Sequence, residues 1–136
     1  MSKAERALAL LLRLVGAVCL LATFAVFMPL RWMAAVHDWL GLGQLPEGRI
    51  VEYLARSLSA FYALMGGLLV FVSFGVRRHA GVITCLAVAS LLFAPMILVV
   101  DLSIGMSLRW TLQEGPFVLL VGTAILLLQW RARVQG

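Results

Sequence analysis

Four charged residues at the ends of long apolar stretches are the first candidates for chemistry in this chain. Glu52 and Arg56 open one stretch, Asp101 closes another, and Glu114 precedes a third. Ionisable side chains within a membrane are costly, so they usually pair with each other or line a wet cavity. Two interpretations of this charged cluster stay open. It is either a polar pocket for a lipid headgroup, a quinone or a small metabolite, or a structural ion-pair network that fixes helix register.

Arg56 is the expected centre of the charged cluster. Glu52 precedes it by four residues, which is the favourable orientation for an ion pair on a helix. The planar guanidinium can satisfy two carboxylates at once. The small-residue face of the third apolar stretch, continued by two turns, reaches Asp101. The sequence therefore predicts that Arg56 binds both Glu52 and Asp101.

Other polar residues offer weaker candidates. We expect His37, Asp38, Arg109 and Trp110 to contribute at most to the outer rim of the cluster. One histidine beside one carboxylate, with no second ligand at helical spacing, indicates hydrated side chains rather than a metal site. The two cysteines form neither a CxxC nor a zinc pattern. We predict no metal, no cofactor and no catalytic residue, and an enzyme is disfavoured because no general base is identifiable.

The composition places these residues in a membrane protein. Of 136 residues, 63% are hydrophobic and 12% charged, and the mean hydropathy is +1.05. A soluble domain of this size is far less apolar. A membrane core of about 30 Å needs about 20 helical residues, and four uncharged runs approach this length, the fourth falling short. We predict an all-α integral membrane four-helix bundle, one domain over residues 1–136, with spans near 9–30, 50–76, 80–101 and 115–131.

The distribution of basic residues predicts the orientation. With both termini in the cytoplasm, seven basic residues lie inside (Lys3, Arg6, Arg13, Arg77, Arg78, Arg131, Arg133) and four outside (Arg31, Arg49, Arg56, Arg109). This bias follows the positive-inside rule and places the charged cluster on the outer side of a bacterial inner membrane. The basic residues flank the spans and form no patch with interleaved aromatics, which argues against nucleic-acid binding despite the net charge of +5.

Local patterns predict how the helices are joined and packed. Residues 31–40 place tryptophans on one side, which is typical of a short helix in the membrane interface. Residues 41–49 are rich in glycine and contain a proline, so we expect an irregular connection. Pro116 is the expected start of the fourth helix, because proline is favoured in the first turn.

Small residues predict where helices touch. Gly115, Gly122 and Gln129 recur every seven residues, which predicts a seam with a partner helix. In the second span, Ala63 and Gly67 are the expected contact points.

The second span also carries a resemblance to a known group. Glu52, Ala55 and Arg56 open it, and Tyr62, Ala63, Gly66 and Gly67 follow. With four spans and this chain length, the sequence resembles the DoxX-like group of small bacterial membrane proteins. Some members are similar to quinone-linked oxidoreductase subunits, so the resemblance implies a quinone as one candidate ligand. The chain has no further redox motif to support that activity.

Two functions from different classes remain open. The first is a binding or accessory subunit that holds a lipid, quinone, small molecule or protein partner at the charged cluster, within a homo-oligomer or a larger membrane complex. The second is a small transporter that acts as an oligomer. Transporters place an acid deep in a span, whereas all four clustered residues are expected at helix ends, so the sequence favours the first function.

Overall fold

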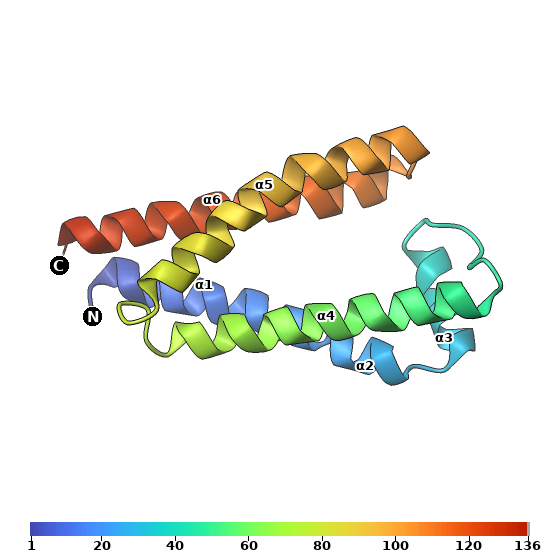
Figure 1. Cartoon of the computed structure of the whole chain (residues 1–136), viewed down its shortest axis with the longest axis horizontal. Coiled ribbons are helices and arrows are strands. Elements are labelled where there is room, and N and C mark those ends of the chain that lie inside the picture. The colour runs from blue at the N-terminus through green and yellow to red at the C-terminus, as the bar shows by residue number, and fades with distance from the viewer. Residues whose placement is uncertain (136) are drawn as a thin grey trace.

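The computed structural model describes residues 1–135, and these contain six helices and no strand. Figure 1 shows them in two long antiparallel pairs joined by one turn. The helices are α1 (Lys3–Leu20), α2 (Ala22–Phe27), α3 (Leu30–Trp39), α4 (Arg49–Ser73), α5 (Ala80–Ile104) and α6 (Leu108–Gln135). The predicted all-α four-helix bundle is therefore confirmed. Of the predicted domain, only Gly136 lies outside the described residues.

Four stretches are long and apolar enough to cross a membrane: Lys3–Phe27, Arg49–Ser73, Ala80–Ile104 and Leu108–Val134. The chain is thus a multi-pass membrane protein. The first stretch begins before residue 9 because Ser2 caps α1, its hydroxyl accepting a hydrogen bond from the Glu5 backbone N–H at 3.2 Å. It ends at Phe27 because the residue before Pro29 is extended, as sterics before proline require.

The fourth span differs from its prediction. Helix α6 begins at Leu108, so Pro116 lies inside the helix and the span is not short. Ser107 starts the helix, since its carbonyl accepts from the Thr111 N–H at 3.0 Å. Proline removes one main-chain hydrogen bond, and helices in membranes tolerate this where neighbouring groups compensate. Glu114 is therefore the seventh residue of a helix rather than a residue preceding one.

The α5–α6 pair follows the predicted seven-residue seam. A Cβ on Gly115 would lie 3.1 Å from the Ala94 carbonyl, and one on Gly122 would lie 3.1 Å from the Ala87 carbonyl. At the third position of the seam, the Gln129 amide donates to the Ala80 carbonyl at 2.7 Å and accepts from the Thr84 hydroxyl at 2.9 Å. Close backbone approach through small residues is what holds helices together in lipid, and this seam is confirmed.

The α1–α4 pair has a tighter contact, at a different glycine from the one predicted. A Cβ on Gly66 would lie 2.6 Å from the Gly16 carbonyl, and one on Gly16 would lie 2.9 Å from the Gly66 carbonyl. Gly67 has no heavy atom within 4 Å of its Cβ position, so its predicted role as a contact point is wrong. Both glycines lie near the same face on a helical wheel, and the sequence does not say which of them the partner helix meets.

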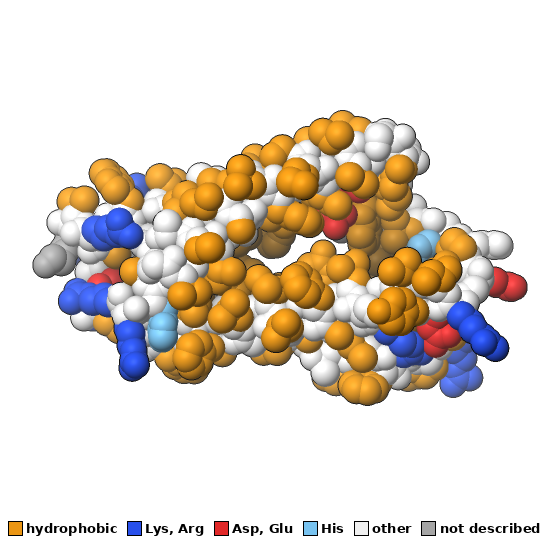
Figure 2. Space-filling view, viewed as in Figure 1, with side chains coloured by type: hydrophobic (Ala, Val, Ile, Leu, Met, Phe, Trp, Pro, Cys, Tyr) orange, Lys and Arg blue, Asp and Glu red, His pale blue; other side chains and the backbone are white. Residues whose placement is uncertain are grey.

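The packed core occupies one half of the bundle. Both termini lie at the same end, called here the terminal end, and α3 lies at the opposite loop end (Figure 1). The core residues are Leu8, Ala9, Leu12, Val72, Val76, Ile83, Ala87 and Ile125, all toward the terminal end. The α5–α6 pair diverges from α4 toward the loop end, and Figure 2 shows an opening between the two pairs. We call this opening the cleft.

The glycine contact yields a first prediction. Gly66→Leu should lower the stability of the bundle by about 1–3 kcal/mol or more, because the new side chain would meet the backbone of α1. Gly67→Leu is the matched control and should change it by less than about 0.5 kcal/mol, as at an ordinary surface site. Thermal unfolding of both variants in the same mild detergent measures the difference. Equal destabilisation would contradict the packing described.

Candidate functional site

The first half of the charged cluster is an ion pair on α4. The Glu52 Oε1 accepts from the Arg56 Nη2 at 2.8 Å and from its Nε at 3.0 Å. Both side chains are partly exposed. The predicted pairing of Glu52 with Arg56, one helical turn apart, is confirmed.

The Arg56 guanidinium also donates hydrogen bonds to the main chain. Its Nη2 donates to the Met28 carbonyl at 3.1 Å, and its Nη1 donates to the Val26 carbonyl. The last carbonyls of a helix lack intrahelical partners, and α2 ends at Phe27. Arg56 thus caps the end of α2 and fastens it to α4. The sequence did not reveal this structural role. Every residue has a main-chain carbonyl, so such a contact leaves no pattern of residue types.

The predicted bond between Arg56 and Asp101 is wrong. Within residues 1–135, the ion pairs are Glu52 with Arg56 and Glu5 with Arg77. The physical reason is the divergence of α5 from α4 toward the loop end (Figure 1). The free main-chain carbonyls at the end of α2 lie closer to Arg56, and they accept the hydrogen bonds that Asp101 was expected to accept.

Asp101 is buried without a partner. Its exposed fraction is 3%, and its Oδ2 has no hydrogen-bond partner among the described residues. It lies one seam repeat beyond Ala94, on the face of α5 that packs against α6. A carboxylate oxygen withdrawn from water without a donor costs free energy, and such a group calls for an explanation.

Glu114 lies beside Asp101 and is half-buried. Its Oε2 accepts from the Trp110 Nε1 at 2.7 Å, one turn earlier on α6. Glu114 precedes Gly115, whose Cβ position lies 3.5 Å from the Leu98 Cβ of α5, and Asp101 is three residues further along α5. Figure 2 shows acidic atoms on the α5–α6 side of the opening. We call Asp101 and Glu114 the acid pair.

The predicted rim residues lie at the loop end. A cavity of about 550 Å³ separates the α3–α4 connection from the α5–α6 turn, and His37 is part of its lining. The His37 Nδ1 lies 2.9 Å from the Gly43 carbonyl, and the Arg109 guanidinium lies 5.7 Å from the Trp39 ring centroid. Asp38 is exposed. The described residues contain no cluster of metal-ligating side chains.

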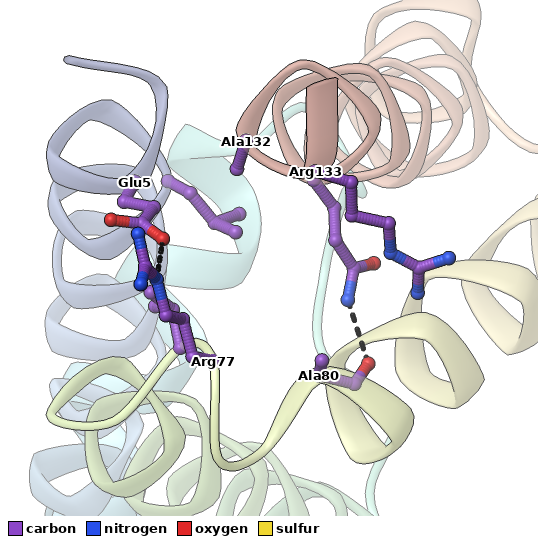
Figure 3. A pocket seen from close by; sticks show the side chains of 8 residues that line it. Glu5, Arg77, Ala80, Ala132 and Arg133 are labelled. Carbon is purple, nitrogen blue, oxygen red and sulfur yellow. Dashed lines mark hydrogen bonds and ion pairs between the residues drawn. The ribbon is translucent and has the colours of Figure 1, made fainter. Parts of the chain in front are cut away.

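Sequence reasoning missed a second polar site at the terminal end. The buried Glu5 carboxylate accepts a hydrogen bond from the Arg77 Nε, and this ion pair ties α1 to the α4–α5 turn (Figure 3). Glu5 raises the pKa of Arg77, which therefore stays charged. The pair borders a cavity of about 290 Å³ that Gln129 also lines. The capping box of Ser2 and Glu5 was the available signal, because it fixes the Glu5 side chain at the start of α1.

No family model, characterised protein or solved structure matches the chain. Within the charged cluster, Arg56 and Glu52 satisfy each other and α2, whereas the Asp101 Oδ2 has no partner among the described residues.

The contacts of Arg56 yield a second prediction. Arg56→Met should destabilise the bundle by about 1–3 kcal/mol, because it strips two carbonyls and a carboxylate of their donor. Unfolding of single and double variants should give a coupling above about 0.5 kcal/mol for Arg56→Met with Glu52→Gln. The pair Arg56→Met with Asp101→Asn should be additive within about 0.5 kcal/mol. Strong coupling in the second cycle would restore the bond to Asp101.

Proposed function

We propose that this chain is a membrane-embedded binding or accessory protein that holds an amphipathic small molecule, such as a lipid or a quinone, in the cleft. The polar head would meet the acid pair, and the apolar part would lie between the two helix pairs. The observation that carries this proposal is Asp101, buried to 97% with an oxygen that no group within residues 1–135 satisfies. A buried polar group without a partner calls for an explanation, and a ligand that enters between the helix pairs would supply one.

The shape of the bundle supports this proposal. The terminal half is closed by a packed core, whereas the loop half opens between α4 and the α5–α6 pair (Figure 2). Apolar side chains border the opening on both sides in that view. A binding site lined mainly by apolar groups with a few convergent polar ones is the usual form of a small-molecule site.

We infer the orientation from the charges. The seven basic residues expected inside gather near the terminal end and in the α4–α5 turn, and the four others lie at the loop end. By the positive-inside rule, the terminal end faces the cytoplasm and the cleft opens toward the outer half of a bacterial inner membrane. This placement is compatible with the DoxX-like resemblance, which remains a prediction.

Transport is the second candidate function, and one observation favours it. Glu114 lies two turns inside α6 rather than at its end, so an acid does lie within a span. The argument from helix ends against a transporter therefore no longer holds for this residue. A binding protein is still the simpler proposal, because the packed core of the terminal half would close one side of a path across the membrane.

Native mass spectrometry from phosphatidylcholine nanodiscs tests the proposed binding function. We expect the protein to retain one amphipathic small molecule from the cells that produced it. Retention should fall on Tyr62→Ala, which removes a partly exposed aromatic side chain from α4, the helix that borders the cleft. Leu64→Ala, a highly exposed position on the same helix, is the control. Retention that is equal in all three proteins, or absent from the parent, would contradict the proposal.

The orientation is tested by labelling. In a cysteine-free variant, a cysteine replacing the exposed Gln44 should react from outside the cell with an impermeant maleimide. A cysteine replacing the exposed Arg78 should react only after the membrane is opened. The reverse pattern would place the cleft on the cytoplasmic side.

A further inference from the structure

A cavity of about 290 Å³ lies at the terminal end, where the α4–α5 turn joins the two helix pairs. Its lining comes from α1, from this turn and from the α5–α6 pair. Leu8 and Val76 give it apolar walls, whereas Glu5, Arg77 and Arg133 bring charge. Figure 3 shows Glu5 and Arg77 on one side of the cavity and Arg133 on the other. Small-molecule sites have volumes of about 300–1,000 Å³, so this cavity has room for a small polar headgroup but not for a whole lipid.

The two arginines that line the cavity keep hydrogen-bond donors for a ligand. A guanidinium has five N–H donors, and Arg77 uses its Nε for Glu5, which leaves its Nη1 and Nη2 groups for another acceptor. Arg133 has no ion pair among the described residues, and Figure 3 shows its guanidinium directed away from the Glu5–Arg77 pair. Both arginine side chains are exposed, so a ligand reaches them without opening the packed core.

The charges around the mouth of the cavity favour an anion. Glu5 is the one acid at the terminal end, among the seven basic residues that gather there. Its carboxylate is buried, and it already accepts hydrogen bonds from Arg77 and from the Ser2 backbone N–H, the latter at 2.8 Å. Glu5 therefore offsets the charge of Arg77 and leaves that of Arg133 without a counter-ion. An unbalanced set of exposed basic side chains attracts anions to this surface.

We propose that the mouth of this cavity binds a phosphate group between Arg77 and Arg133, carried by an anionic lipid of the surrounding leaflet or by a soluble phosphate ester. The planar guanidinium matches the spacing of phosphate oxygens and binds two of them at once. The first and fourth spans both reach the terminal end, so the cavity lies near the headgroups of one leaflet. This site is separate from the cleft and does not depend on the function proposed for it.

Native mass spectrometry from nanodiscs of phosphatidylglycerol and phosphatidylcholine in equal parts tests the site. Both lipids carry a phosphate, but the choline ammonium cancels its charge. We expect the released protein to retain phosphatidylglycerol at least about threefold more often than phosphatidylcholine, because basic pockets between spans select anionic headgroups.

A second arm adds glycerol 3-phosphate and distinguishes the two sources of phosphate. Phosphatidylglycerol that stays bound assigns the site to a lipid. Glycerol 3-phosphate that replaces it in the spectrum assigns the site to a soluble ester. Equal retention of the two lipids, with no glycerol 3-phosphate bound, would overturn the proposal.

A pair of variants with the same loss of charge makes the result specific. Arg133→Gln should reduce phosphatidylglycerol retention to that of phosphatidylcholine. Arg131→Gln is the matched control and should leave it unchanged, because this exposed arginine lies on the same turn of α6 but does not line the cavity. Neither arginine has an ion pair among the described residues, so both variants should melt at the temperature of the parent.

Two results with these variants would overturn the terminal site. An equal fall in Arg131→Gln and Arg133→Gln would show a diffuse basic surface instead of a site. The Tyr62→Ala variant, which tests the cleft, should retain phosphatidylglycerol as the parent does. A fall in that variant alone would place the anionic lipid in the cleft.

Discussion

The contact between small residues along two seams is the interaction on which the rest of the structure depends. In lipid there is no hydrophobic force to bring helices together, so close backbone approach must do it. Gly16 and Gly66 join α1 to α4, and Gly115 and Gly122 join α5 to α6. Each seam makes a stiff hairpin, and the hairpins then meet through the larger side chains of the terminal-end core. Because no seam joins α4 to the second hairpin, the loop half is left open.

The contacts of Arg56 are all made on one side of the cleft. Arg56 lies one helical turn from Glu52 and binds it. It also donates to two main-chain carbonyls at the end of α2, where the first span ends. Once these bonds are made, no basic residue among residues 1–135 pairs with the carboxylates on the second hairpin. The contacts that fix α2 to α4 on one side of the cleft therefore leave the acids on the other side without a basic partner.

The sequence predicts local and periodic features of this chain well. The four spans, the short α3 and the Gly115 seam all follow from hydropathy and spacing, and Glu52 with Arg56 follows from one helical turn. Its failures concern contacts between distant elements. Helical periodicity does not distinguish Gly67 from Gly66 as the contact point, and it predicts a bond between Arg56 and Asp101 that the structure lacks. Both errors arise because the angle between the hairpins is set by packing, which leaves no period in the sequence. Placing the start of α6 at Pro116 was wrong, because the helix continues through this proline. Glu114 therefore lies within the helix and not before it.

The ion pair of Glu5 and Arg77 lies where the two hairpins are joined, and this gives it mechanical leverage. The α4–α5 turn is the covalent link between the hairpins, and Glu5 fastens α1 to that turn. Helices α4 and α5 have 25 residues each, a lever arm of about 37 Å at helical rise. A rotation of about 5° at this joint would displace the far tips by about 3 Å at this arm length. The ion pair at the terminal end therefore bears on how far the two hairpins separate at the loop end.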